Sequence, residues 1–445
     1  MKLRYILIIG IVVRLCMMPF FAHPYDMESW YKISEGMVAG NSPTSLWITP
    51  VWAYTMFPVA HLYSWISGTF HTGPMPINVA PPEIRPDSTF HVSLIPGAVF
   101  NSLIKIPLII SDVLIAFLLY GIVYLMRKNK KLAERAALLW FLNPFSIWIS
   151  CGWGMFDSLP VLFTLASLFF LLKDRVQFSS LFLALAVGSK LYPILFLIPI
   201  TAYLLKTSKS KAKRIDRCVR FYLIFLVTTF ILFFPYLSAV GGYSSSLIGV
   251  TTTGPLTLGL TYWSVLHFAP TLAELAAWVS IGTFIVLLSV VSWKISKISF
   301  KDPLSDLVVA MLACVLVIYL SVRIVPEQYF IWALPFIVIL CVGRQTKVTI
   351  YYYLLSAIAF IYSILHVLLP FFLLATSPWI GNALVGMLNI LNFPGRELFL
   401  VALGVLFSFL VLIILLELLF GRRGLLKAIA SSIVKPLRRV WQRIF

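Results

Sequence analysis

The sequence has 445 residues, of which 60% are hydrophobic and 11% are charged, and its mean hydropathy is +0.97. This composition excludes an ordinary soluble domain and indicates a polytopic membrane protein. The formal net charge of +19 comes from short basic clusters between long apolar stretches, so it reports loop topology and excludes a nucleic-acid partner. Five scattered cysteines form neither a disulfide framework nor a metal-ligand pattern.

In chain order, the apolar stretches predict an all-α protein with about twelve spans. They lie near residues 5–22, 95–126, 136–151, 158–172, 178–190, 191–205, 220–240, 271–293, 304–322, 329–342, 348–373 and 397–420. The stretch 191–205 is either a full span or part of a re-entrant pair. Both termini are expected in the cytoplasm, because most basic clusters then lie inside. Residues 1–420 form the membrane domain, and residues 421–445 form a basic amphipathic tail on the cytoplasmic side.

The connection after the first span, residues 23–94, is long and lies outside in this orientation. It is rich in tryptophan, tyrosine and proline, a composition typical of helices that lie in the membrane interface. An additional short span between Val51 and Trp65 is the alternative for its first half. Its second half, from Thr72 to Asp87, predicts an ordered loop or a flexible lid.

Two carboxylates one residue apart, Asp26 and Glu28, open this external connection within the stretch His23–Tyr31. Ionisable groups at the edge of hydrocarbon are costly unless they carry out chemistry or bind a cation. The alternative is that both are solvated charges that end a helix. On a helix, side chains at i and i+2 diverge by about 200°, whereas on an extended chain they share a face. The local conformation therefore decides whether the two carboxylates act together.

Further polar residues gather at the outer ends of later spans, namely Asp157, Lys190 and Arg323. A cation there can neutralise a lipid phosphate, Arg with a planar fork and Lys as a point charge. The alternative is that the two cations pair with nearby carboxylates only to hold helix ends together. For Asp112 and Lys105, in the second span, we favour a structural pairing or a polar contact within the bundle.

Four segments in order along residues 5–345 resemble the integral-membrane glycosyltransferases of the GT-C superfamily. They are Trp140–Pro144, Gly152–Ser158, Gly188–Pro193 and Glu327–Pro335. Within this superfamily the chain is similar to the catalytic subunits of GPI mannosyltransferase I and their prokaryotic relatives. Their second span also carries an aspartate before an apolar run such as Val113–Tyr120.

The resemblance implies a GT-C-like fold and the transfer of one sugar from a polyprenyl-phosphate or dolichyl-phosphate donor at the external or lumenal face. In that superfamily an acidic residue of the first external loop is essential, which gives Asp26 the role of catalytic base, with Glu28 completing the pair. The usual pattern is Asp-x-Asp, and this chain has Asp26-Met27-Glu28. The substrate-binding residues are then expected to be Trp153, Asp157, Lys190, Tyr192, Arg323 and Gln328.

We expect no obligatory metal, because protein cations can balance a polyprenyl phosphate, although Asp26 and Glu28 could hold Mg²⁺ or Mn²⁺. The expected partners are the lipid-phosphate sugar donor, a lipid-linked glycan or similar acceptor, and membrane lipids. Mannose is the favoured hexose, and the acceptor is left open. The absence of an Asn-x-Ser/Thr sequon favours a prokaryotic plasma membrane, with the endoplasmic reticulum membrane as the eukaryotic alternative.

Two other classes of protein compete with the enzyme. A lipid or solute transporter, or a flippase, would also have about twelve spans, but it usually shows internal repeats and polar groups near the bilayer midplane. The sequence shows neither feature. A non-catalytic membrane scaffold would reduce Asp26, Lys190 and Arg323 to contacts between helix ends.

Overall fold

The computed structural model describes residues 2–41, 48–70, 73–79, 92–208, 210–239, 258–343, 346–367, 372–373 and 395–429. Most of these residues are helical, as expected for a chain in lipid, where each backbone N–H and C=O must find an internal partner. The N-terminal half contains helices α1 (Leu3–Met17), α2 (Pro24–Val38), α3 (Pro50–Phe70), α4 (Gly97–Arg127), α5 (Lys130–Phe141), α6 (Pro144–Ile147), α7 (Ser158–Leu172), α8 (Val176–Ser189), α9 (Leu197–Thr207) and α10 (Lys211–Phe233). It also contains strands β1 (Met75–Val79) and β2 (Val92–Ile95), the π-helical turn η1 (Trp148–Trp153), and the 3₁₀ helices η2 (Tyr192–Phe196) and η3 (Phe234–Ala239).

The C-terminal half is built from helices α12 (Ala273–Lys297), α13 (Pro303–Ser321), α14 (Leu334–Gly343), α15 (Thr346–Val367) and α18 (Arg396–Ile429), with 3₁₀ helices η4 (Tyr262–Phe268), η5 (Pro270–Leu272) and η6 (Glu327–Trp332). Helix α18 is interrupted at Gly421, whose φ of 65° is non-helical. The predicted tail begins at this residue, and its part from 430 to 445 lies outside the described residues.

Six of the described helices are long and apolar enough to cross a membrane, or seven if the bent pair formed by α5 and Pro144–Trp153 counts as one span. Shorter apolar helices occupy four further predicted spans, at Ser158–Leu172, Val176–Ser189, Tyr192–Thr207 and Glu327–Val342. A multi-pass membrane protein is therefore confirmed, whereas the count of twelve spans stays a prediction. Neither α3 nor α1, which holds the predicted first span, is among the six, so the additional span between Val51 and Trp65 stays an alternative.

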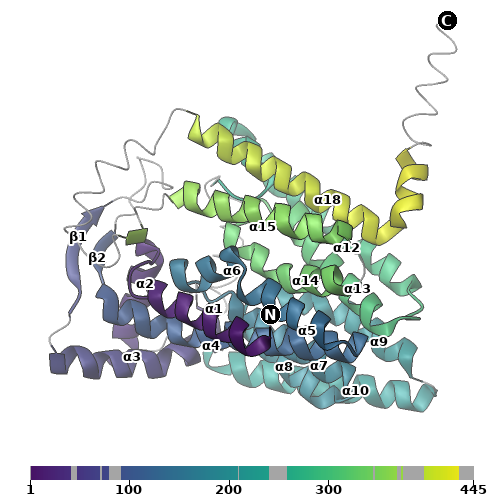
Figure 1. Cartoon of the computed structure of the whole chain (residues 1–445), viewed down its shortest axis with the longest axis horizontal. Coiled ribbons are helices and arrows are strands. Elements are labelled where there is room, and N and C mark those ends of the chain that lie inside the picture. Colours follow the sequence, from purple (N-terminus) through teal and green to yellow (C-terminus); the bar gives the residue numbers. More distant parts are fainter. Residues whose placement is uncertain are drawn as a thin grey trace, which may run out of the picture.

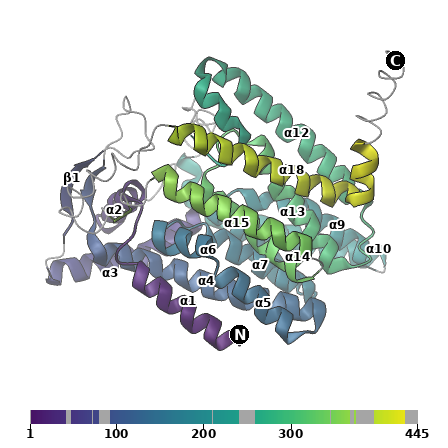
Figure 2. The same cartoon turned by 45° about the horizontal axis from the view of Figure 1, so that its top comes forward.

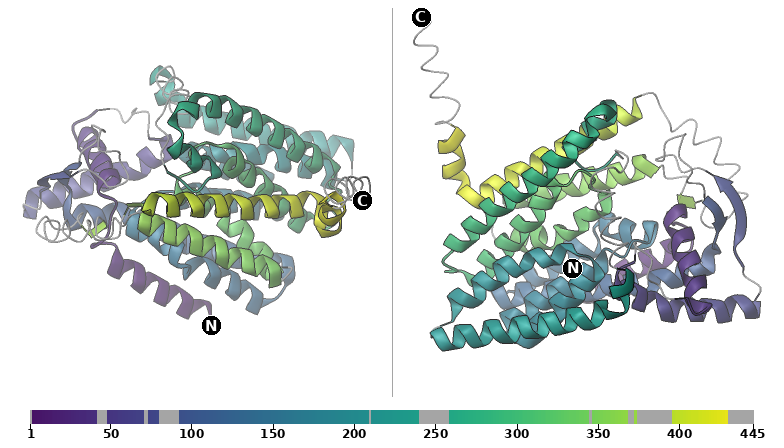
Figure 3. Two further views of the ribbon diagram at one scale, coloured as in Figure 1. Left: turned by 90° about the horizontal axis from the view of Figure 1, so that it is seen from above. Right: turned by 180° about the vertical axis from the view of Figure 1, so that it is seen from behind.

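The described parts of the connection between α1 and α4 form a cap at one end of the helix bundle. Helices α2 and α3 lie there together with the hairpin of β1 and β2, at the left of Figure 1 and at the right of the rear view in Figure 3. The strands pair antiparallel, with Met75 opposite Ile95 and Val79 opposite Val92. This small sheet interrupts an otherwise helical chain, at the place where a loop or a lid was predicted; residues 80–91 lie outside the described part.

The bundle itself is continuous from the N-terminal to the C-terminal half. Helix α4 packs against α5 and α7, α8 packs against α7 and α10, and α13 packs against both α12 and α18. Figure 2 shows α18 running alongside α15. Because the buried residues of both halves form one apolar cluster, the segments that carry the predicted site are held by a single core.

Two ionisable residues of α4 are buried in this core. Asp112 accepts a hydrogen bond from Arg14 of α1, with 2.9 Å between Nε and Oδ2. Lys105 donates to the carbonyl oxygens of Phe21 and Cys151, the latter at 2.8 Å. Both contacts agree with the structural pairing that we favoured for these residues, because buried charges need such partners.

Candidate active site

The local sequence fixes how Asp26 is presented. Pro24 suits the first position of a helix, and His23 is the N-cap of α2, so α2 begins two residues before Asp26. Asp26 then lies in the first turn, where a negative charge is favoured by the helix dipole. Its side chain is 22% exposed. Helix α2 thus presents a carboxylate that a substrate can reach.

Both side-chain contacts of the Asp26 carboxylate are made by the same oxygen, Oδ2. Oδ2 accepts a hydrogen bond of 2.7 Å from Trp153 Nε1 and lies 3.0 Å from His23 Nδ1. Burial alone would raise the pKa of Asp26, but the charge of His23, the hydrogen bonds from His23 and Trp153, and the field of Lys190 together hold this pKa below its ordinary value. Asp26 is therefore ionised at neutral pH.

Trp153 reaches Asp26 because the helix after Asn143 ends in a π-helical turn, a feature often found at functional sites. The backbone N–H of His23 donates to the carbonyl of Trp153 (3.1 Å), and the two rings stack with centroids 4.8 Å apart. Gly154 follows with φ +91°, and a Cβ there would come within 2.5 Å of Met27 Cε. This glycine allows the close approach of η1 and α2.

Glu28 faces a different environment from Asp26. Its buried carboxylate accepts from the backbone N–H of Ser93 (3.1 and 3.2 Å) and from the Ser93 hydroxyl, and it pairs with Lys32 at 2.6 Å. Since α2 is helical, the i and i+2 side chains diverge. Glu28 joins α2 to strand β2, and the structure does not bring it to the partners of Asp26.

A second group of predicted residues meets at Lys190, whose charge acts on Asp26. Lys190 follows α8 and pairs with the fully buried Asp157 at 2.6 Å, and Asp157 Oδ1 also accepts from Trp332 Nε1 at 2.7 Å. The Lys190 ammonium lies over the rings of Phe156 (5.1 Å), Tyr329 (4.8 Å) and Trp332 (5.2 Å). Aromatic faces stabilise such a cation. An ammonium has three N–H donors, so donors remain for a further anion.

Tyr192 adds a further ring to the aromatic cluster of Phe156, Tyr329 and Trp332 around Lys190, whereas Arg323 forms a hydrogen bond with another element. Tyr192 stacks on Trp332 with ring centroids 4.1 Å apart. Gln328 is buried, and its Oε1 has no hydrogen-bond partner among the described residues. Arg323 donates to the carbonyl of Ala273 at the start of α12 (3.0 Å). Among the described residues, no hydrogen bond or ion pair joins Arg323 to Lys190 or to the Asp26 carboxylate.

Sequence reasoning missed two parts of this arrangement. The first part is His23, which caps α2. Its position directly before a proline that can begin a helix was the available signal in the sequence. Trp332 lies in the matching segment Glu327–Pro335, and nothing in the sequence links it to Asp157. Each contact depends on the packing of segments that are distant in the chain.

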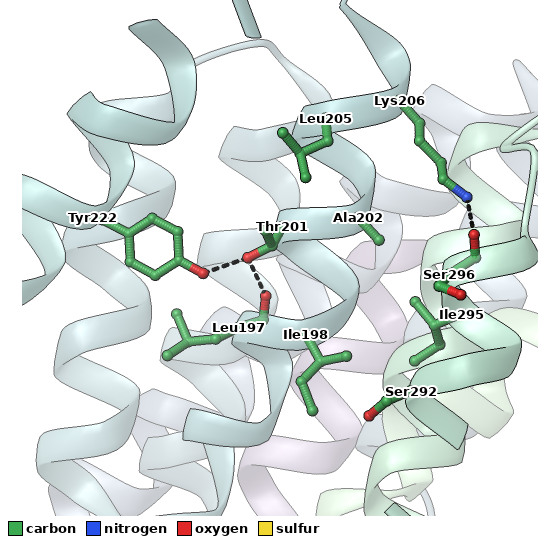
Figure 4. A pocket seen from close by; sticks show the side chains of 10 residues that line it. All are labelled: Leu197, Ile198, Thr201, Ala202, Leu205, Lys206, Tyr222, Ser292, Ile295 and Ser296. Atoms are coloured by element: carbon green, nitrogen blue, oxygen red, sulfur yellow. Dashed lines mark hydrogen bonds between the residues drawn. The ribbon is translucent and has the colours of Figure 1, made fainter. Parts of the chain in front are cut away.

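The described residues contain no group of three or more His, Cys, Asp or Glu side chains that could hold a metal ion. Asp26 and Glu28 also point to different partners, so they do not share one cation position. A groove of about 420 Å³ lies between α9, α10 and α12. Figure 4 shows the side chains that line it. Half of its lining residues are aliphatic, and the others are Thr201, Lys206, Tyr222, Ser292 and Ser296. It contains none of the predicted site residues.

Comparison with known proteins tests the resemblance. The family described as GPI transamidase subunit PIG-U matches residues 67–278. The chain is also similar to GPI mannosyltransferase 1 of Dictyostelium discoideum, with 38% identity over 104 residues that cover 22% of this chain and 23% of that protein. The enzyme of the same name from Kluyveromyces lactis is 35% identical over 92 residues, 20% of this chain and 23% of its own length.

The chain is similar to GPI mannosyltransferases over about a fifth of its length, 20–22%. The predicted relationship is thereby confirmed, while the matched segments span only about a quarter of these relatives, 23% in both cases. The PIG-U match covers Trp153, Asp157 and Lys190, but it begins after Asp26 and ends before Arg323.

Proposed function

We propose that this chain is a membrane glycosyltransferase that moves a hexose, with mannose favoured, from a polyprenyl- or dolichyl-phosphate donor to a lipid-linked glycan or a similar acceptor. The observation that carries the proposal is the partly exposed carboxylate of Asp26, which accepts a hydrogen bond from Trp153. Against the effect of burial, the charges of His23 and Lys190 lower its pKa. The relatives named GPI mannosyltransferase 1 support the same reaction class.

The chemistry follows from these groups. The bond between the anomeric carbon and the phosphate oxygen breaks, and its electron pair leaves with the lipid phosphate. The acceptor hydroxyl oxygen forms the new glycosidic bond, and its proton passes to Asp26. The described contacts of the carboxylate fall on Oδ2, which leaves Oδ1 for the hydroxyl. Lys190 balances the charge that develops on the leaving phosphate.

Arg323 and Gln328 are proposed to extend the donor site beyond Lys190. Both residues lie in the stretch 323–332, which also contains Tyr329 and Trp332. The rings of Tyr329 and Trp332 lie near the Lys190 ammonium. Lys190→Ala and Arg323→Ala should each lower donor use by about 10² to 10³-fold, the usual cost of one transition-state contact. Arg323→Lys should retain part of the activity, because the charge survives while the planar fork is lost.

We propose that the cap of α2, α3 and the hairpin lies on the external or lumenal side, in a plasma membrane or, in a eukaryote, the endoplasmic reticulum. The basic residues in the last turn of α12 and at the start of α10, together with both termini, would lie in the cytoplasm. The shorter apolar helices would complete about twelve spans with the long ones, with local thinning or tilting at their ends.

The test is sugar transfer by the purified protein in lipid nanodiscs, with a panel of polyprenyl-phosphate hexoses as donors. Asp26→Asn keeps the size of the side chain but removes its basicity, so transfer should fall by about 10² to 10⁴-fold while donor binding persists. Glu35→Gln is the matched control, because its carboxylate lies farther along the same helix and accepts from Tyr31 Oη. Transfer by Asp26→Asn near the parental rate would refute the assignment.

A second candidate is a non-catalytic subunit that binds a GPI-type lipid. The match to the family described as a GPI transamidase subunit favours it, since that match covers Lys190 but not Asp26. In this case the parental protein would transfer no sugar from any donor of the panel. Binding of a lipid-linked glycan would remain, and Asp26→Asn would not change it.

A further inference from the structure

One ring nitrogen of His23 lies within reach of two different groups of Asp26. Nδ1 is 3.3 Å from the backbone nitrogen of Asp26, for which it acts as a cap, and 3.0 Å from the carboxylate Oδ2. These contacts make opposite demands, because the backbone N–H needs a lone pair on Nδ1 and the carboxylate needs a proton there. The distance to Oδ2 is the shorter of the two, and this contact requires a proton on Nδ1.

The His23 ring is held in this position. It is buried, it stacks on Trp153 at an interplanar angle of 8°, and it meets the ring of Phe372 edge-on with centroids 5.8 Å apart. Its own backbone N–H is fixed to the carbonyl of Trp153. Because the ring is packed on both sides, its protonation rather than its rotation decides which group of Asp26 it serves.

Charges of both signs lie around the pair. The carboxylate of Asp26 lies beside the ring, and Glu28, farther along α2, is paired with Lys32. Lys190 is the opposing cation whose field reaches Asp26, and it is paired with Asp157. An imidazolium beside a carboxylate is stabilised by the opposite charge.

We propose that His23 is a positioning residue of the transfer reaction: its protonated ring donates to Oδ2 of Asp26, keeps the carboxylate ionised and leaves Oδ1 turned toward the acceptor hydroxyl. This inference rests on the proposed function, since it requires Asp26 to be the base. The two donors on Oδ2, from Trp153 and His23, fix the carboxylate plane in the manner of an oriented general base.

The test is the pH profile of kcat for His23→Asn in the nanodisc assay. Asparagine still caps a helix, so α2 keeps its start, but it has no charge to give to Asp26. The acid limb of the profile, where kcat falls as Asp26 takes up a proton, should therefore move to higher pH by about one to three units. This is the usual effect of one adjacent opposite charge on the pKa of an aspartate. We expect KM for the donor to change less than twofold, since His23 makes no donor contact in this scheme.

His61→Asn is the matched control, because His61 lies on α3 in the same external segment and is exposed. Its acid limb should coincide with that of the parent. His23→Ser, which also caps helices without a charge, provides a second variant if His23→Asn folds poorly.

An acid limb that stays within 0.3 units of the parent, roughly twofold in proton affinity, in both His23 variants with intact thermal stability would overturn the inference. If Asp26→Asn were inactive in the same series, only the role of His23 would be wrong. If Asp26→Asn were active, the proposed function would fail with it.

Discussion

The buried pair of Arg14 and Asp112 allows a sharp test of what holds the bundle together. The guanidinium of Arg14 donates to Asp112 Oδ2 (2.9 Å) and to the carbonyl of Phe141 (2.7 Å), and it lies 4.1 Å from the centre of the Phe141 ring. Both charged side chains are essentially inaccessible, at 0% and 1% exposure. One residue of α1 thus connects α4 and α5.

Asp112→Asn would leave the Arg14 charge in this apolar interior with neutral partners alone. Removal of one member of a buried pair typically costs about 3 to 5 kcal/mol. At about 1.4 kcal/mol for each factor of ten, the ratio of folded to unfolded protein should fall by roughly a hundredfold to a few thousandfold. The double variant Arg14→Met with Asp112→Leu removes both charges together, and it should be within about 2 kcal/mol of the parent.

Thermal unfolding in a mild detergent, followed by tryptophan fluorescence, measures these differences, and the double variant is then assayed for sugar transfer. We expect a large loss of stability in Asp112→Asn and near-normal stability and transfer in the double variant. Asp112→Asn with parental stability would refute the energetic argument. A stable but inactive double variant would show that Asp112 takes part in the chemistry.

Three further predictions concern the site and its orientation. Gly154→Ala should destabilise the protein by about 1 to 2 kcal/mol or more in thermal unfolding. The positive φ of Gly154 disfavours a side chain, and Met27 occupies the space that a Cβ would need. Unchanged stability would mean that η1 and α2 can separate. Glu28→Gln should retain most transfer but make the hairpin more sensitive to limited proteolysis, and a loss as large as that of Asp26→Asn would make Glu28 catalytic. A cysteine at Ser67 should react with an impermeant thiol reagent in intact cells and one at Ser210 should not, and the reverse pattern would invert the proposed topology.

The sequence alone determined the class of the protein and much of its local structure. Apolar stretches long enough for a bilayer have few alternatives to helices, and in the described part of the chain the predicted stretches are helical, while their number as membrane spans stays a prediction. The same reasoning placed a carboxylate motif after the first span, and the matching segments indicated the relationship that the comparisons confirm. These features depend on residues that are close together in the chain.

Tertiary structure decided which of the predicted residues meet. Asp157 finds Lys190 33 positions later and Trp332 175 positions later, and Trp153 reaches back 127 positions to Asp26. No local pattern encodes such distances, because they are set by how the helices pack. The helical conformation of α2 separated Glu28 from Asp26, because it turned the two carboxylates of the motif toward different partners.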